Sequence, residues 1–258
     1  MKLKDTDIST QLSTIKQRGY VVVKANNIIQ KSHFSLTAQQ QKALLTMISK
    51  IKPDDKPEQH YTFSIKEFCL MCNIECDSGK NYDNVKRSLY SIDKQVMWIK
   101  EPDKKKQTRL RWLDKLYINE GSGNIEFTFH SDMFPYLLNL REQYTQYNLV
   151  SILPMRSKYA IRLYELLKSY EGAHVIPLTD VNMVSFTIED VKKRLDAEKY
   201  ENKEIRRRVL EPSVKEINNY TDLQVSYEMK KVNSRSFNVV SFTFERIGAP
   251  KAHKKLCD

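Results

Sequence analysis

Three consecutive arginines, Arg206, Arg207 and Arg208, are the side chains of this sequence with the clearest chemical potential. A guanidinium group donates two parallel hydrogen bonds to O6 and N7 of guanine, whereas the ammonium group of lysine is better suited to phosphate. Successive residues of an α-helix point about 100° apart, so the three arginines cannot all face one groove of DNA. We predict base contacts from Arg206 and Arg207, while a solvated helix face is the simpler interpretation of such a charge run.

The segment that contains these arginines, residues 202–218, has the apolar spacing of an amphipathic helix. The side chains expected to face its core are Ile205, Val209, Leu210, Val214 and Ile217. Two further outward-facing candidates for DNA contact are Lys203 and Lys215. Pro212 interrupts the pattern, because a proline inside a helix costs about 3 kcal/mol. We expect a kink or a new turn at this point.

A polar hairpin after this helix supplies the second set of candidate contacts. Apolar residues alternate along residues 223–229 and 240–244, which predicts two strands with one buried face. The loop between them contains cations and hydrogen-bond donors: Lys230, Lys231, Asn233 and Arg235. Such a loop can lie over a minor groove or over phosphates, although charged hairpin tips are also common for solubility alone.

The first half of the chain contains a comparable helix, predicted over residues 81–97. Its expected core residues are Val85, Leu89, Ile92 and Val96. Its candidate contacts are Lys80, Asn84, Lys86 and Arg87. The basic loop that follows this helix adds Lys104, Lys105, Lys106 and Arg109. This composition fits phosphate contact better than base discrimination.

No arrangement for catalysis or metal binding emerges from the sequence. Cys69, Cys72 and Cys76 have the spacing C-x2-C-x3-C, but no fourth ligand lies at a convincing spacing. The same spacing places them on one face of a helix, where free cysteines pack as small apolar groups. The six glycines form no phosphate-binding loop, and the five histidines include no His-x-His pair. We therefore expect a binding protein without cofactor or metal rather than an enzyme.

The two halves of the chain repeat one order of elements, which is a stronger signal than either half alone. The triplet Phe-Ser-Ile around Ser64 matches the triplet Phe-Thr-Ile around Thr187, and each central residue is a predicted helix N-cap. An amphipathic helix precedes each triplet, and the first such helix has Thr37 and Gln40 at capping-box spacing. Helix, strand, helix, helix and hairpin is the order of a winged helix. The predicted fold class is α+β, with two tandem winged-helix domains related by an internal repeat.

The repeat also predicts the domain organisation. We expect an N-terminal tail, a first domain, a second domain and a basic C-terminal tail, over residues 1–19, 20–140, 141–247 and 248–258. The first domain has additional strand sequence around a Gly-Ser-Gly turn. Its edge could pair with another subunit or be covered within the domain.

The net charge of +11 on 258 residues indicates a polyanionic partner, of which nucleic acid is the commonest. The N-terminal residues lack the apolar core of a signal peptide, and no segment has the roughly 20 apolar residues of a membrane span. Four cysteines in a chain of this length fit a reducing compartment. We expect a soluble, intracellular protein that binds nucleic acid and no membrane.

Three stretches of the sequence resemble the replication initiators of iteron-containing plasmids. They are residues 22–51, 157–170 and 206–228, and they include the motifs Arg-Leu-Tyr-Glu-Leu-Leu and Pro-x-x-x-Glu-Ile-Asn. The resemblance runs from about residue 20 to residue 247 and accounts for Pro212, which the family tolerates at this point. The chain departs from the family at Gln40 or Gln41, where an acidic residue is usual, and in its second hairpin loop, which lacks a frequent glycine.

The resemblance implies more than DNA binding. Such initiators bind direct repeats in double-stranded DNA as monomers, recruit the host replication initiator and helicase, and promote opening of an adjacent AT-rich stretch. Many also form a homodimer in equilibrium with the monomer, joined largely through the first domain, that represses its own gene. Two other classes stay open: a winged-helix transcription regulator without a replication role, and an origin-nicking replication enzyme.

Overall fold

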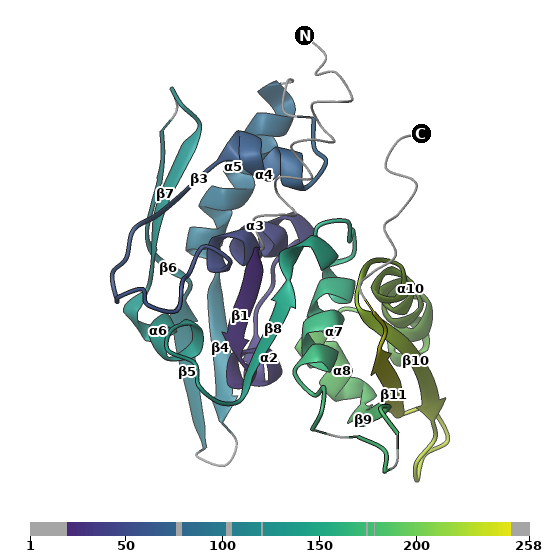
Figure 1. Cartoon of the computed structure of the whole chain (residues 1–258). Helices are drawn as coiled ribbons and strands as arrows, with labels where there is room; N and C mark the ends of the chain where they lie inside the picture. Colours follow the sequence, from purple (N-terminus) through teal and green to yellow (C-terminus); the bar gives the residue numbers. More distant parts are fainter. Residues whose placement is uncertain are drawn as a thin grey trace. The chain divides into compact units, whose positions relative to one another are not determined.

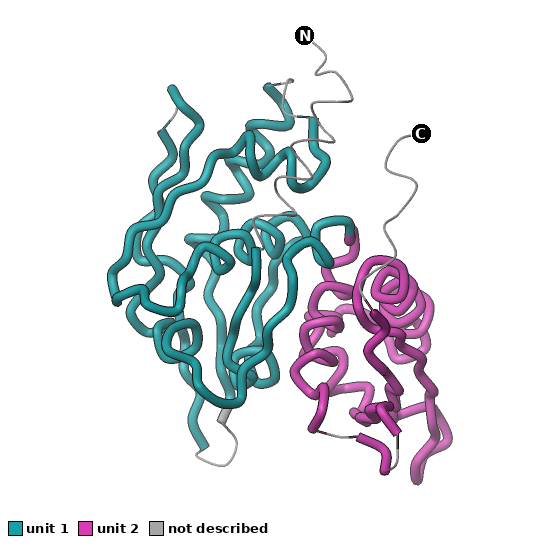
Figure 2. The backbone as a smooth tube through the Cα atoms, in the orientation of Figure 1, with its two compact units in different colours: residues 1–154 teal, residues 155–258 magenta. Residues whose placement is uncertain are grey.

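The computed structural model describes residues 20–75, 79–101, 105–119, 121–173, 175–177 and 179–248. The chain divides into two compact units, Met1–Pro154 and Met155–Asp258, which Figure 2 shows in two colours. Each unit combines helices with antiparallel sheet, so the predicted α+β class is confirmed. The predicted N-terminal tail and residues 249–258 lie outside the described residues.

The helices of unit 1 are α2 (Asn26–Lys31), α3 (Ala38–Ile48), α4 (Ile65–Met71), α5 (Gly79–Lys94) and α6 (Phe134–Leu137), with the 3-10 turns η2 (Ser131–Met133) and η3 (Leu149–Ser151). Its strands are β1 (Val21–Ala25), β2 (Ser32–His33), β3 (Tyr61–Ser64), β4 (Val96–Glu101), β5 (Lys106–Arg111), β6 (Leu113–Ile118), β7 (Asn124–Phe129) and β8 (Tyr144–Asn148). In the described residues they form antiparallel sheets with the strand orders β1-β8, β2-β4-β5 and β3-β7-β6.

Unit 2 follows the same plan with fewer elements. They are α7 (Lys158–Lys168), β9 (Asn182–Thr187), α8 (Ile188–Leu195), α9 (Asn202–Ile205), a π-helical turn η4 (Arg206–Leu210), α10 (Glu211–Tyr220), β10 (Leu223–Lys230) and β11 (Val239–Arg246). The elements α9, η4 and α10 follow one another without a break and are called the long helix below. The sheet order is β10-β11-β9, with β11 in the centre (Figure 1).

Hydroxyl side chains fix the starts of the helices as predicted. The Thr37 hydroxyl accepts a hydrogen bond from the Gln40 N–H, and the Gln40 side chain accepts one from the Thr37 N–H at 2.7 Å. Ser64 caps α4, and Thr187 caps α8 by accepting the Asp190 N–H at 3.0 Å. These caps satisfy backbone donors that have no partner inside the helix.

The final hairpin of the winged helix, called the wing below, is β6–β7 in unit 1. The prediction that this strand sequence is an addition to the first domain is therefore wrong. Strand β3 pairs with β7 as β9 pairs with β11 in unit 2. One backbone hydrogen bond recurs in both units: Ile65 N–H donates to the carbonyl of Gly123, and Ile188 N–H to that of Asn238, each at 2.9 Å. The strand sequence predicted as an addition therefore forms the wing. The basic hairpin β4–β5, which contains the basic loop compared above with the loop of the second half, is an insertion that pairs with β2.

The boundary between the units lies later than the predicted boundary after residue 140. Strand β8 pairs with β1, with Tyr147 opposite Val22, and Figure 1 shows the two strands side by side. Both side chains are buried, so this segment belongs to unit 1. Pairing between strands so distant along the chain leaves no local signal in the sequence.

Pro212 is accommodated by the π-helical turn. A proline has no N–H, and its ring clashes with the carbonyl four residues earlier. The Glu211 N–H donates to the carbonyl of Arg206, five residues earlier, which widens the helix ahead of the proline. The extra residue in this turn shifts the buried face, so Ser213 is fully buried and Val214 only half-buried. The other four predicted core residues of this helix are fully buried.

Helix α5 ends at Lys94, earlier than predicted. The run Val-Met-Trp-Ile that follows is rich in β-branched and aromatic residues and forms β4. Val96, predicted to lie in the helix core, is half-buried in this strand, and Met97 takes the fully buried position. The other three predicted core residues of α5 are buried.

The cysteines do not share one helix face. Helix α4 ends at Met71, so Cys72 lies beyond it. Cys69 is buried and disulfide-bonded, whereas Cys72 has a free thiol. Cys76 lies outside the described residues. The prediction of three free cysteines packed on one helix is therefore wrong for Cys69 and Cys72.

Candidate nucleic-acid interface

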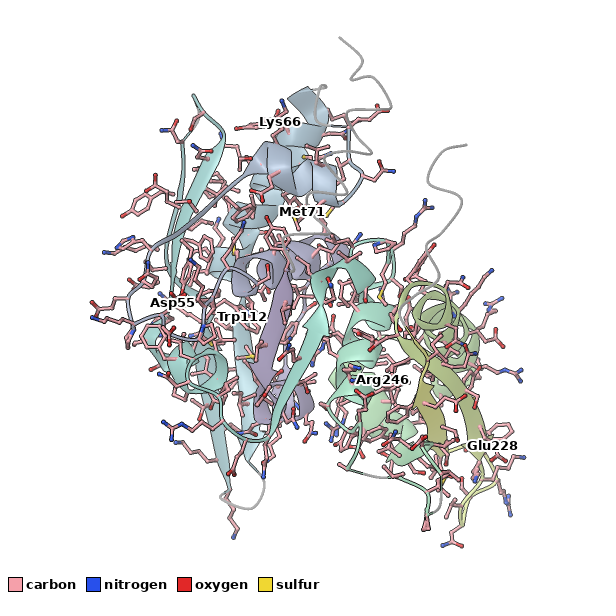
Figure 3. The ribbon with its side chains drawn as sticks, in the orientation of Figure 1. Asp55, Lys66, Met71, Trp112, Glu228 and Arg246 are labelled. Carbon is pink, nitrogen blue, oxygen red and sulfur yellow. The ribbon has the colours of Figure 1, made fainter. Side chains whose placement is uncertain are left out.

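A groove of about 720 Å³ runs between the start of the long helix and the hairpin β10–β11 in unit 2. Its lining residues are Asn202, Lys203, Arg206, Tyr227, Glu228, Met229, Lys231, Arg235, Ser236 and Phe237. Four of them are cationic and one is a carboxylate, Glu228, which Figure 3 labels on β10. The groove is therefore electropositive and also has the apolar side chains of Met229 and Phe237 in its lining, a combination that suits a sugar-phosphate strand.

Arg206 is positioned by two neighbours at the side of this groove. Its Nε lies 2.9 Å from Oε1 of Glu211, and Tyr227 of β10 lies near its side chain. The hydrogen bond to Glu211 raises the pKa of Arg206 further, so the guanidinium stays charged. The side chain remains 68% exposed, which leaves donors free for a ligand.

Arg208 is positioned from the other side of the helix. Its Nε lies 2.8 Å from Oε1 of Glu204, and its guanidinium carbon lies 5.5 Å from the ring centre of Tyr200. The hydrogen bond from Arg208 lowers the pKa of the Glu204 carboxyl. Arg208 therefore stabilises the first turns of the helix in the free chain.

Arg207 has no such neighbour. Its side chain is exposed, and no described residue forms a hydrogen bond or ion pair with it. The same holds for Lys215, one further exposed cation on this helix. Among the described residues Lys203 forms an ion pair only with exposed Glu201, at 2.7 Å, and exposed pairs of this kind contribute about 0–1 kcal/mol. These three cations are accessible to a ligand.

Asn238 fixes the base of the hairpin loop. Its side chain accepts a hydrogen bond from the Val232 N–H and donates one to the Val232 carbonyl, both at 2.8 Å. Its own N–H donates to the Lys230 carbonyl at 3.0 Å. Asn233 adopts a φ of +50°, which asparagine tolerates, so the loop turns without the glycine that its sequence lacks.

The cations of this loop differ in their surroundings. Lys230 lies 3.1 Å from Glu228. Lys231 places its Nζ 5.2 Å from the ring centre of Phe237. Arg235 is exposed and has no ion pair within the described part of the chain. Of the predicted cations, Lys203 and Arg206 of the helix and Lys231 and Arg235 of the loop line the groove together, whereas Arg207, Arg208, Lys215 and Lys230 are not part of its lining.

Residues 21–168 match a family model described as Initiator Replication protein, WH1, and residues 187–246 match one described as Initiator Rep protein, WH2. The chain belongs to the initiator Rep protein family. This membership confirms the predicted resemblance, and the two matched models confirm the tandem winged-helix fold of this Rep protein.

Two relatives extend this comparison of the Rep protein. A replication initiation protein of Escherichia coli is 24% identical over 212 residues, which are 80% of this chain and 64% of the relative. The chain thus spans somewhat less than two thirds of that relative. A crystal structure of Pi initiator protein in complex with iteron DNA is similar with a TM-score of 0.70 and 14% identity, over 89% of this chain and 98% of the other. This likeness shows the fold.

The predicted contacts of unit 1 are divided between two elements. Those on α5 are Lys80, Asn84, Lys86 and Arg87. Those at the inserted hairpin β4–β5 are Lys105, Lys106 and Arg109, while Lys104 lies outside the described residues. The wing β6–β7 itself has no Lys or Arg between residues 116 and 129. Unit 1 of the Rep protein therefore lacks the basic wing that unit 2 has.

Sequence reasoning missed the residues that position the arginines, namely Tyr200, Glu204, Glu211 and Tyr227. The spacing of four between Glu204 and Arg208 is a recognised helix signal that could have found one pair. Arg206 contacts Glu211, five residues later, because residues five apart are neighbours in a π-helical turn. Tyr227 comes from another element, so no local pattern indicates it.

A second pocket, of about 340 Å³, lies in unit 1 and includes Glu58, His60 and Asp114 in its lining. The described residues nevertheless contain no group of three or more His, Cys, Asp or Glu side chains that could hold a metal ion. None of the described helices combines the length and the apolar character needed to cross a membrane.

Proposed function

We propose that this Rep protein initiates plasmid replication by binding direct repeats of an origin in double-stranded DNA. The electropositive groove of unit 2, which Lys203, Arg206, Lys231 and Arg235 line, is the observation that carries this proposal. Arg207, which follows Arg206 in the chain, is exposed and has no ion pair among the described residues. Family membership and the shared fold with Pi initiator protein, which was solved with iteron DNA, support the choice of DNA as ligand.

In this proposal the long helix enters the major groove. The second helix of a helix-turn-helix derivative reads base edges with its amino-terminal residues, and the long helix begins at Asn202. We assign base contacts to Arg206 and Arg207. We assign phosphate contacts to Lys203, Lys215, Lys230, Lys231, Asn233 and Arg235, with Arg208 held by Glu204 until DNA competes for it.

Unit 1 contributes phosphate contacts from α5 and from the inserted hairpin β4–β5. It also supplies the surface of a homodimer that exchanges with the monomer. The dimer represses the chain's own gene, and the DNA-bound monomer promotes origin opening with the host initiator and helicase in the bacterial cytoplasm. Resemblance to the Rep family supports these steps, and all of them act by binding rather than by catalysis.

A binding titration of the full chain tests the proposal. The repeats that flank its gene are the labelled ligand, random duplex DNA is the competitor, and the salt concentration is varied. Specific DNA readers bind their sites about 10³-fold or more tighter than random DNA. Binding that ignores sequence and disappears with salt would contradict the proposal.

The double variant Arg206→Ala/Arg207→Ala should lose most of this preference, whereas Arg141→Ala, an exposed arginine outside the proposed contacts, should keep it. Maintenance of a plasmid that carries the repeats then separates an initiator from a transcription regulator. A regulator would bind the repeats without supporting replication.

A further inference from the structure

The loop of unit 2 exposes two large apolar side chains. Val232 is 47% and Phe237 is 48% exposed. Leaving apolar surface in water is unfavourable, and hairpin tips are usually occupied by polar residues. These side chains therefore contribute little to the stability of the unit and are available to a ligand.

The backbone presents these two side chains from a defined position. Val232 is held by both side-chain hydrogen bonds of Asn238, at 2.8 Å each, and Phe237 directly precedes Asn238. The two apolar residues thus lie on the two sides of one loop, between the end of β10 and the start of β11. Such anchoring lowers the entropy that is lost when the loop meets a ligand.

Charge around this apolar pair indicates the chemistry of its ligand. Phe237 lines the same groove as Lys203, Arg206 and Arg235, and Lys231 lies over its ring at 5.2 Å. The exposed ring of Phe237 among these cations fits a polyanion that also offers an apolar surface. Duplex DNA meets both conditions, because base faces and sugars lie between its phosphates.

We propose that Val232 and Phe237 form an apolar wedge that enters the minor groove and partly unstacks one base step beside the sequence read by the long helix. The inference rests on the proposed DNA binding and extends it to deformation of the DNA. Apolar side chains inserted in this way kink a duplex toward its major groove. The neighbouring cations bind the phosphates on each side of the opened step.

The experiment uses the full chain and duplexes that contain the repeat, with 2-aminopurine placed at successive steps and with dyes at both ends. The wild type should raise 2-aminopurine fluorescence at one step and shorten the end-to-end distance. Phe237→Ala should abolish the local fluorescence signal and weaken binding about 10-fold or more, since base–aromatic contacts of this kind typically give such losses. The slope of affinity against salt should not change, because no phosphate contact is removed.

Two control variants sharpen this test. Phe237→Leu keeps an apolar wedge and should retain most of the bend. Met183→Ala removes a side chain that is 47% exposed on β9 of the same unit, and it should behave as the wild type. Thermal unfolding of each variant reports whether unit 2 is intact.

The wedge is refuted if Phe237→Ala binds and unstacks the repeat as the wild type does. It is also refuted if the variant loses affinity while the fluorescence and the bend persist, since Phe237 would then be a surface contact only. If the wild-type chain instead shows no preference for the repeats, the proposed function itself is wrong. Failure of the wedge and failure of the proposed function are therefore distinguishable.

Discussion

Arg206, Arg207 and Arg208 are adjacent in the sequence but meet different neighbours in the fold. Arg206 is held by Glu211 and Arg208 by Glu204, at 2.9 Å and 2.8 Å. Arg207 has no ion pair within the described residues. An arginine that is held by a carboxylate must exchange this partner for DNA, whereas a free one need not. The neighbours therefore rank the three arginines in a way that residue type alone does not.

Replacement of single arginines tests the assignment of Arg206 and Arg207 to bases. Arg206→Ala should lose about 1–3 kcal/mol of discrimination at one base position, because a bidentate guanine contact is worth that much. Arg207→Ala should show a loss of the same size at a neighbouring position. Competition binding to repeats with single base changes measures both. Equal weakening on all sequences would make the mutated arginine a phosphate contact.

Cys72 gives a prediction on pH at the same scale. Burial raises the pKa of the Cys72 thiol to about 11, and nearby Lys42 opposes this only in part. The thiol is therefore protonated at neutral pH, and the reactive thiolate increases about tenfold with each pH unit. Alkylation of Cys72, followed by mass spectrometry of its peptide, should accelerate without levelling between about pH 7 and pH 9.5. A plateau near pH 8.5, the usual pKa of an exposed cysteine, would contradict this.

At the scale of elements, the two wings perform one structural task with different chemistry. Both hairpins complete a three-stranded sheet and accept a hydrogen bond from the first residue of the helix that follows β3 or β9, namely Ile65 or Ile188. The loop of unit 2 is basic and partly apolar, whereas that of unit 1 has no Lys or Arg. The units thus share a fold, and we expect them to divide the work on DNA.

The turn of the unit 1 wing requires glycine at one position. Gly123 has a φ of +67°, and a Cβ there would lie 3.2 Å from the Tyr82 hydroxyl. Gly123→Ala should lower the free energy of unfolding by about 1–2 kcal/mol, because L-residues are strained in the left-handed region. Gly121 has no positive φ, and its nearest neighbouring atom would lie at 3.5 Å. Gly121→Ala should therefore cost at most about 0.5 kcal/mol. Urea titration of both variants and the wild type measures these differences in the free energy of unfolding.

The cap of α8 is a second element whose contribution can be measured. The Thr187 hydroxyl accepts the Asp190 N–H at 3.0 Å. Thr187→Ala should cost about 1 kcal/mol of stability, while Thr187→Ser keeps the acceptor and should cost much less. Denaturant unfolding of the three chains provides the comparison. Equal losses for Ala and Ser would assign the effect to the β-branched side chain in β9 instead of the cap.

At the scale of the whole molecule, two winged-helix domains and a net charge of +11 predict an extended contact with DNA. Each domain that docks in a major groove occupies about one helical turn, or 10–10.5 base pairs. Footprinting should therefore show protection over about two turns of each repeat, and the affinity should fall steeply with salt. Protection of a single turn would show that only one domain docks.

The sequence by itself determined the elements whose signals are local. Thr37, Ser64 and Thr187 are caps because a hydroxyl reaches a backbone N–H only three residues away. Apolar spacing likewise predicted most of the buried face of the long helix. The order of helices and strands, which is the same in both halves, predicted the two winged helices, because each of these elements is indicated by a local pattern.

The tertiary structure decided what depends on distant segments. Pairing of β3 with β7, and not the composition of any loop, determines which hairpin is the wing of unit 1. Pairing of β1 with β8 determines the boundary between the units. The position of Arg206 depends on a π-helical turn and on Tyr227 from another strand. Such contacts form between residues far apart along the chain, so no pattern within one segment can specify them.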